Sequence, residues 1–100
     1  MTTKRIHSEI LGVYEAYRGW RPLIDRLIEA AGPHDLADLS CKEKWGGLDF
    51  GMFRAIHLDD LIGELEELSL EICEICDAPA YQSEKSGWRR TVCKKHDDGR

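Results

Sequence analysis

The sequence predicts a small α+β protein: a helical hairpin, a β-hairpin and an acidic amphipathic helix, joined to a C-terminal zinc-ribbon or treble-clef-like module. Three observations predict this class. Apolar residues recur at helical spacing in three segments, they alternate with polar residues in a fourth, and two pairs of metal-ligand residues lie near the end. With 100 residues, we expect a single domain, with an α+β body over 1–72 and a metal-binding module over 73–100.

The first two elements are predicted to form the helical hairpin. Each carries an apolar stripe at helical spacing: Ile6, Ile10, Val13, Tyr14 and Tyr17 in the first, and Leu23, Leu27, Ile28 and Ala31 in the second. The chain breaks between them at 19–22, and Pro22 suits the first turn of the second helix. Gly32 and Pro33 predict its end.

The next segment has the period of two that is typical of strands. One face carries Leu39, Cys41, Glu43 and Trp45 before the Gly46-Gly47 pair, and Leu48, Phe50 and Met52 after it. This pattern predicts a β-hairpin with its turn at Gly46-Gly47. Cys41 is expected to pack as a small apolar residue, and the alternative is a further metal ligand.

The third helix is expected over 58–72. Its apolar stripe contains Leu58, Leu61, Ile62, Leu65, Leu68 and Ile72. Its other side carries Asp60, Glu64, Glu67 and Glu71. Such a charge run is typical of a solvated face. The functional alternatives are a surface that binds a basic protein partner and one that imitates the phosphate track of a nucleic acid.

The strongest functional signal is the pair Cys73 and Cys76, followed after sixteen residues by Cys93 and His96. Two ligand pairs with this spacing are typical of one structural zinc ion per chain. A redox dithiol, a disulfide and a catalytic zinc ion are the alternatives. They are less favoured, because no βαβ unit is evident, no oxidising compartment is indicated, and four protein ligands leave no open position. A short hairpin is expected between the pairs, over 80–84 and 88–92, turning at Ser86-Gly87.

The charge is unevenly divided along the chain. Residues 1–72 hold 14 acidic and 8 basic residues, for −6, whereas 73–100 hold 5 acidic and 6 basic residues, for +1. The acidic body disfavours broad nucleic-acid binding. The first residues lack the apolar run of a signal peptide, and no stretch reaches the length of a membrane span, so a cytoplasmic location without membrane contact is expected.

One basic and aromatic cluster stands out, composed of Trp88, Arg89, Arg90, Lys94 and Lys95. It favours a nucleic-acid contact, in which the indole stacks on a base and the cations contact phosphates. The alternative is structural. Zinc with three thiolates carries a formal charge of −1, which neighbouring cations stabilise.

No catalytic arrangement is apparent. His7, His34 and His57 are scattered among acidic residues without a recognisable acid–base or nucleophile pattern. We therefore expect a protein that is not an enzyme.

Three segments together carry a family resemblance: 19–27, 42–48 with the sequence KEKWGGL, and a tail made of 72–76, 87–88 and 91–96. In this order and spacing the chain resembles a family of small uncharacterised phage, prophage and bacterial proteins, over about 19–96. Asp77 departs from the glycine that usually follows the knuckle, and Asp49 and Gly51 stand where bulkier or basic residues are common. The resemblance implies an α+β fold with a zinc-ribbon-like end, and it brings no established activity.

Taken together, these observations predict a zinc-stabilised, non-catalytic accessory protein that binds and modulates a host or phage protein, in the bacterial host cytoplasm if it is phage-encoded. The alternative is a nucleic-acid-binding zinc-ribbon protein that uses the basic aromatic cluster. The sequence does not identify the partner or the oligomeric state.

Overall fold

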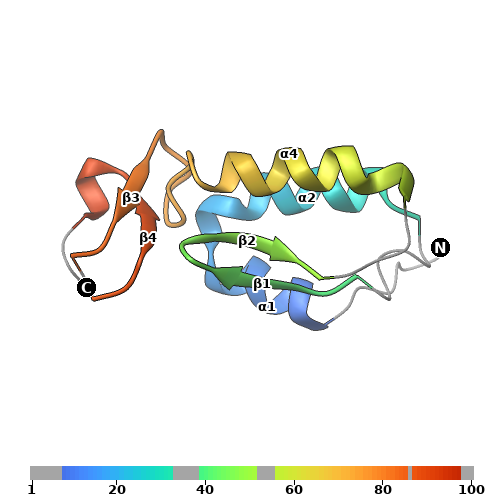
Figure 1. The fold of residues 1–100 in the computed structure, drawn as a ribbon, viewed down its shortest axis with the longest axis horizontal. Helices are drawn as coiled ribbons and strands as arrows, with labels where there is room; N and C mark the ends of the chain where they lie inside the picture. The colour runs from blue at the N-terminus through green and yellow to red at the C-terminus, as the bar shows by residue number, and fades with distance from the viewer. Residues whose placement is uncertain (1–7, 33–38, 52–55, 86, 98–100) are drawn as a thin grey trace.

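The computed structural model describes residues 8–32, 39–51, 56–85 and 87–97. Within these ranges it contains three α-helices and two antiparallel β-hairpins, so the predicted α+β class is confirmed. Figure 1 shows the helices and the first hairpin packed together, with the second hairpin at one end of the molecule. Among the described residues, no helix is both long and apolar enough to cross a membrane.

The N-terminal helices agree with the predicted helical hairpin. Helix α1, Ser8–Ala16, and helix α2, Arg21–Ala30, contact each other and are joined through the short 3-10 turn η1, Arg18–Trp20. Pro22 lies in the first turn of α2, where its missing N–H costs no helical hydrogen bond. Ile6, the first member of the predicted apolar stripe, lies outside the described residues.

The first β-hairpin is also present, but its turn lies one residue earlier than predicted. Strand β1, Cys41–Lys44, pairs with strand β2, Gly47–Phe50, so the two turn residues are Trp45 and Gly46. Both have positive φ, 56° and 84°, as a two-residue type I′ turn requires. Gly47 instead begins β2. A Cβ atom there would lie 2.6 Å from Leu70 Cδ2, so the glycine permits close packing.

Helix α4, Asp59–Ser69, follows the 3-10 turn η2, Ile56–Leu58, and ends earlier than the predicted limit of 72. Glu71 therefore lies beyond the helix, and Ile72 forms an isolated antiparallel bridge with Pro79. At the end of α4, the buried Ser69 hydroxyl accepts a hydrogen bond from Leu48 N–H at 2.8 Å.

The main core lies between these elements, because α1 contacts β1, α4 contacts β2 and α2 contacts α4. Its buried apolar residues are Ile10, Val13, Trp20, Leu23, Ile24, Leu27, Ala31, Leu39, Cys41, Leu48, Phe50, Leu58 and Leu65. Cys41 is only 1% exposed, which confirms that it packs as an apolar residue. The predicted core positions Ile6 and Met52 lie outside the described residues.

Candidate metal centre

The two predicted ligand pairs lie on two turns near the end of the described chain, with a β-hairpin between them. A tight turn carries Cys73 and Cys76, and a short hairpin follows, made of β3, Tyr81–Ser83, and β4, Arg90–Val92. Cys93 directly precedes the 3-10 turn η3, Lys94–His96, which carries His96. The hairpin confirms the predicted strand pairing, with shorter strands. Its turn residue Ser86 lies outside the described residues.

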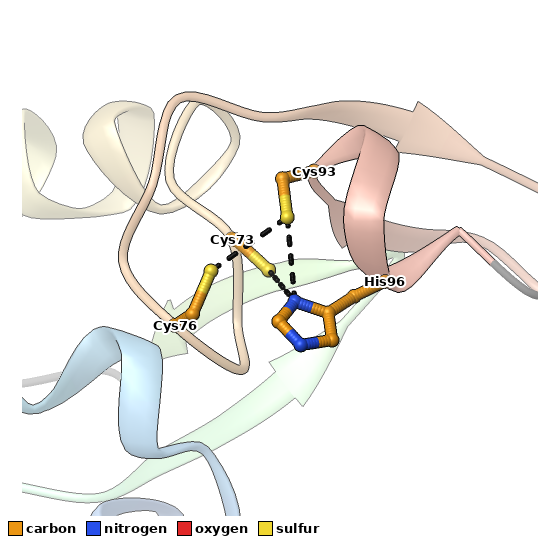
Figure 2. Close-up of side chains that lie close together, drawn as sticks. All are labelled: Cys73, Cys76, Cys93 and His96. Carbon is orange, nitrogen blue, oxygen red and sulfur yellow. Dashed lines mark hydrogen bonds between the residues drawn. The ribbon is translucent and has the colours of Figure 1, made fainter.

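The four predicted ligand side chains converge on one point. Figure 2 shows the Cys73, Cys76 and Cys93 sulfurs directed toward the Nδ1 side of the His96 ring. Nδ1 lies 3.6 Å from Cys73 Sγ and 3.3 Å from Cys93 Sγ, and the Cys76 and Cys93 sulfurs are 3.6 Å apart. All four ligand atoms lie within 4.8 Å of one another. The cluster is therefore able to hold a metal ion.

These separations fit a tetrahedral ion better than a disulfide. Metal–sulfur bonds of about 2.3 Å and metal–nitrogen bonds of about 2.0 Å place tetrahedral ligands roughly 3.5 to 3.8 Å apart. The Cys76–Cys93 separation of 3.6 Å agrees with that range and greatly exceeds a disulfide bond length, about 2.05 Å. All four cysteines of the chain are free thiols.

The turn that carries the first pair is held by its own backbone. Cys73 N–H donates to the Ala78 carbonyl at 2.8 Å, and Asp77 N–H donates to the Cys73 carbonyl at 3.0 Å. Asp77 has a φ of 62°, in the left-handed region that favours glycine and that aspartate tolerates better than most residues. Asp77 thus occupies a position whose backbone conformation favours glycine.

Residues from the helical hairpin hold the same turn from the other side. Gly19 N–H donates to the Glu74 carbonyl at 2.9 Å, and the Trp20 indole N–H donates to the Ile72 carbonyl at 3.1 Å. Gly19 has no room for a side chain, because a Cβ atom would lie 1.8 Å from the Cys73 carbonyl oxygen. The metal cluster is therefore packed directly against η1.

Two acidic residues that the sequence analysis did not assign brace the module. The first is Glu74, whose Oε2 lies 3.6 Å from Arg90 Nε and whose Oε1 accepts from Thr91 N–H at 3.3 Å. Burial raises the pKa of Glu74 above its ordinary value, although the Arg90 charge opposes that shift. The sequence does show that Glu74 is a charged residue between the two cysteines of the knuckle. It does not show that its hydrogen-bond donor is Thr91, seventeen positions away.

The second is Asp97, which follows His96 and connects η3 to β3. Its carboxylate accepts hydrogen bonds from the Tyr81 and Ser83 hydroxyls and lies 3.3 Å from Lys85 Nζ. Hydrogen bonds from Ser83 and Tyr81 lower the pKa of Asp97 below its ordinary value.

The local backbone also favours the thiolate form of Cys93. Burial alone would raise the pKa of Cys93, but the backbone N–H of His96 donates toward its sulfur and the neighbouring thiols add to this effect. The net result is that the pKa of Cys93 lies below its ordinary value. Thiolate is the form that binds metal.

The predicted basic cluster is distributed over three local structures. Trp88 and Arg89 are exposed in the segment before β4, and Lys94 and Lys95 are exposed on η3. Arg90 lies on β4 and faces Glu74, so its charge is engaged within the module.

The predicted acidic face is only partly a helical face. Asp60, Glu64 and Glu67 are exposed on α4, whereas Glu71 lies beyond its end. Glu64 Oε1 also lies 3.0 Å from Arg26 Nη2 of helix α2, so part of this negative charge is neutralised inside the molecule.

The remaining candidates lie apart from the cluster or outside the described residues. Cys41 belongs to the main core rather than to the metal cluster. Burial, with the charges of Asp49, Glu66 and Glu9, raises the pKa of the Cys41 thiol to about 12. His57 lies on η2, while His7 and His34 fall outside the described residues.

Comparison with protein-family models, with curated proteins and with solved structures found no match for this chain.

Proposed function

We propose that Cys73, Cys76, Cys93 and His96 bind one structural zinc ion per chain. The observation that carries this proposal is the convergence of three sulfurs and one imidazole nitrogen within 4.8 Å. Thiolate and imidazole ligands at tetrahedral separations favour zinc over the harder divalent ions, which prefer oxygen. The order of knuckle, β-hairpin and helical turn is that of a treble-clef-like module, here with a short 3-10 turn as its last element.

The proposed zinc site is structural rather than catalytic. Four protein ligands leave no position for an activated water molecule. The small core under the module supports the same conclusion, since among the described residues its buried apolar members are Cys73, Val92 and Cys93. Such a core is too small to fold without an additional constraint, and metal binding supplies that constraint.

For the whole chain, we infer a non-catalytic accessory protein that binds and modulates another protein in the cytoplasm. The family resemblance suggests a host or phage protein as the target. The acidic body, at −6 over residues 1–72, supports a protein partner over nucleic acid, because it would repel phosphates.

Nucleic-acid binding through Trp88, Arg89, Lys94 and Lys95 is the second candidate. The observation in its favour is that these four side chains are exposed. The ion pair between Arg90 and Glu74 counts against nucleic-acid binding, since the Arg90 charge offsets the Glu74 carboxylate. Phosphate binding would weaken steeply as the salt concentration rises, because each phosphate contact releases condensed counterions.

The metal proposal is tested on protein purified without added metal. We expect one zinc per chain by elemental analysis, and a thermal transition that a strong chelator removes. Cys76→Ser should abolish zinc binding without opening the core, because Cys76 is exposed. Cys41→Ala is the matched control and should retain one zinc per chain. Zinc-free protein with an unchanged melt would contradict the proposal.

The partner proposal is tested by affinity capture from bacterial lysate with and without nuclease. A protein recovered in stoichiometric amount after nuclease treatment supports the accessory-factor function. Recovery that depends on nucleic acid would favour the second candidate. The variants Glu64→Lys and Glu67→Lys then test whether α4 contributes to the contact.

A further inference from the structure

Two adjoining hollows lie where the first β-hairpin meets the C-terminal module. The larger, about 550 Å³, extends over β2 and α4, and the smaller, about 310 Å³, extends toward Trp88. Trp45 and Arg89 line both hollows, so they form the boundary between them. We call this combined surface the tryptophan groove.

The groove gathers large apolar side chains that the core does not use. Trp45 is 69% exposed, Trp88 is 64% exposed and Leu70 is 41% exposed. By contrast, the third tryptophan, Trp20, is fully buried. Exposed aromatic side chains that line one concave surface are typical of binding sites, because such side chains contribute most of the energy of many interfaces.

A tryptophan at position 45 is difficult to explain by the needs of folding alone, because of its backbone conformation. The first position of a type I′ turn favours asparagine, aspartate or glycine, because its φ is positive. Trp45 adopts a φ of 56° there, and its exposed ring contributes little to the core. Residues held in such conformations are concentrated at functional sites.

The turn is also fixed in place before any partner binds. Gly46 N–H donates to Glu43 Oε2 at 2.7 Å, and the Gly46 carbonyl accepts from the buried Thr91 hydroxyl at 2.6 Å. The Arg89 side chain lies close to the same glycine, because its Cγ would be 3.2 Å from a Cβ atom there. Contacts from both hairpins therefore set the position of Trp45, and a preorganised side chain loses less entropy on binding.

The charge around the groove identifies the chemistry of its occupant. The lining contains five carboxylates and two cations, for a formal charge of −3. The carboxylates are those of Glu43, Asp49, Glu66, Glu67 and Glu84. Aromatic rings beside carboxylates favour arginine and lysine, whose cations interact with the ring face and whose stems cover apolar surface. The same charge repels a nucleic-acid backbone.

We propose that the tryptophan groove binds a basic peptide segment of a protein partner, with arginine or lysine against Trp45 and Trp88 and an aliphatic side chain over Leu70. The proposal rests on the inferred protein-binding function and places the contact in this groove, whose lining includes Glu67 of α4 but not Asp60 or Glu64. Alternation of basic and aliphatic residues suits an extended segment, whose successive side chains point to opposite sides.

The test is a titration followed by ¹H–¹⁵N NMR of the metal-loaded protein. The probe is an eight-residue peptide of alternating arginine and leucine, added up to about 1 mM. The indole N–H signals of Trp45 and Trp88 should shift saturably. The Trp20 indole, which donates to the Ile72 carbonyl, should not move and serves as an internal control. Binding should weaken as salt rises, because part of the attraction is electrostatic.

Trp45→Asn is the decisive variant, because asparagine suits the turn while the indole is removed. We expect it to keep its metal and its melting temperature and to bind the peptide at least about tenfold more weakly. Leu11→Ala is the matched control: Leu11 is 45% exposed on α1, away from the groove, and its removal should leave the affinity unchanged.

Four results would overturn the groove proposal. Three of them are the absence of saturable indole shifts, equal binding of a peptide with glutamate in place of arginine, and tighter binding of single-stranded oligothymidylate at the same indoles. The fourth is an unchanged peptide affinity in Trp45→Asn. Because the zinc content of the same sample is measured separately, failure of the groove is distinguishable from failure of the metal site. Affinity capture from lysate tests the protein-binding function independently of the groove.

Discussion

The Thr91 hydroxyl donates a 2.6 Å hydrogen bond to the Gly46 carbonyl, across 45 positions of the sequence. The same hydroxyl accepts from Gln82 Nε2 at 3.1 Å, and Thr91 is completely buried. One side chain of β4 thus joins the turn of the first hairpin to both strands of the second. Figure 1 shows the consequence, with the β1–β2 turn directed at the C-terminal module.

Replacing this hydroxyl should uncouple the two hairpins. Thr91→Val preserves the shape of the side chain but leaves the Gly46 carbonyl without its donor, which should lower the free energy of unfolding by about 1–3 kcal/mol. Thr91→Ser retains the hydroxyl and should lose only about 1 kcal/mol, from the missing methyl group. Urea unfolding of the metal-loaded variants measures both. A valine variant as stable as the wild type would show that the bond contributes nothing.

Gly19 should be the glycine least tolerant of substitution in the described part of the chain. In Gly19→Ala the new Cβ would meet the Cys73 carbonyl oxygen at 1.8 Å and the Glu74 carbonyl carbon at 2.7 Å, both of them backbone atoms. We expect a loss of about 3 kcal/mol or more and a weaker affinity for zinc.

Gly63→Ala is its matched control. A Cβ atom at this helical position of α4 meets nothing within 4 Å, so the variant should gain about 0.5–1 kcal/mol in unfolding free energy. Thermal melts and competition for zinc with a chromophoric chelator measure the two effects. Equal behaviour of the two alanine variants would contradict the contact between η1 and the knuckle.

Asp77 offers the opposite kind of change. Its φ of 62° is unstrained for glycine, so Asp77→Gly should raise the stability of the metal-bound protein by up to about 1 kcal/mol. Asp77→Ala should lower stability by a similar amount. The alanine Cβ is strained in the left-handed region, and alanine lacks the polar side chain that lets aspartate tolerate it. Differential scanning calorimetry of both variants gives the comparison, and an ordering of alanine above glycine would refute it.

Stability should also depend on pH through Cys41. Its folded pKa of about 12 exceeds the ordinary value of 9.0, so the native state holds the proton more tightly than the unfolded state. The contribution of Cys41 is therefore fully present below pH 9 and is lost as the pH rises toward 12. At pH 10 the loss should be about 1 kcal/mol.

The measurement is the difference between wild type and Cys41→Ala in urea unfolding at pH 8 and at pH 10. Other titrating groups are common to both proteins and cancel in the comparison. The alanine variant should lose less stability over this interval. Parallel losses in the two proteins would mean that Cys41 does not titrate differently on folding.

Hydrophobic periodicity predicted the elements of the body more reliably than it predicted their ends. Apolar residues recur along α1, α2 and α4 and alternate around Leu48 and Phe50 because those positions are buried. The period of such a pattern can be recognised in the sequence itself. The turn at Trp45-Gly46 was misplaced by one residue. A Gly-Gly pair indicates a turn, but the tertiary contact with Leu70 assigns Gly47 to β2. Ile24 was likewise missed, although it is fully buried on α2.

The metal cluster was predictable because ligand spacing is a local property of the sequence. The contacts that support it are not. Glu74 pairs with Arg90, and Gly19 packs against Cys73, only because distant segments meet in the fold. Similarly, the basic cluster and the acidic face were defined by sequence proximity. The fold engages one member of each, since Arg90 faces Glu74 and Glu64 faces Arg26.

Two hydrogen bonds tie the metal-binding module to η1: one from the Trp20 indole to the Ile72 carbonyl, and one from Gly19 N–H to the Glu74 carbonyl. The module should therefore lose stability when it is separated from the rest of the chain. A peptide cut out after residue 72, or grafted onto another scaffold, would carry every metal ligand and none of the η1 turn that covers them. Its knuckle carbonyls would face solvent, and a metal ion bound there would exchange more readily. Transplanting the site therefore requires a matching glycine–tryptophan turn from the recipient, supplied from a segment far away in its sequence.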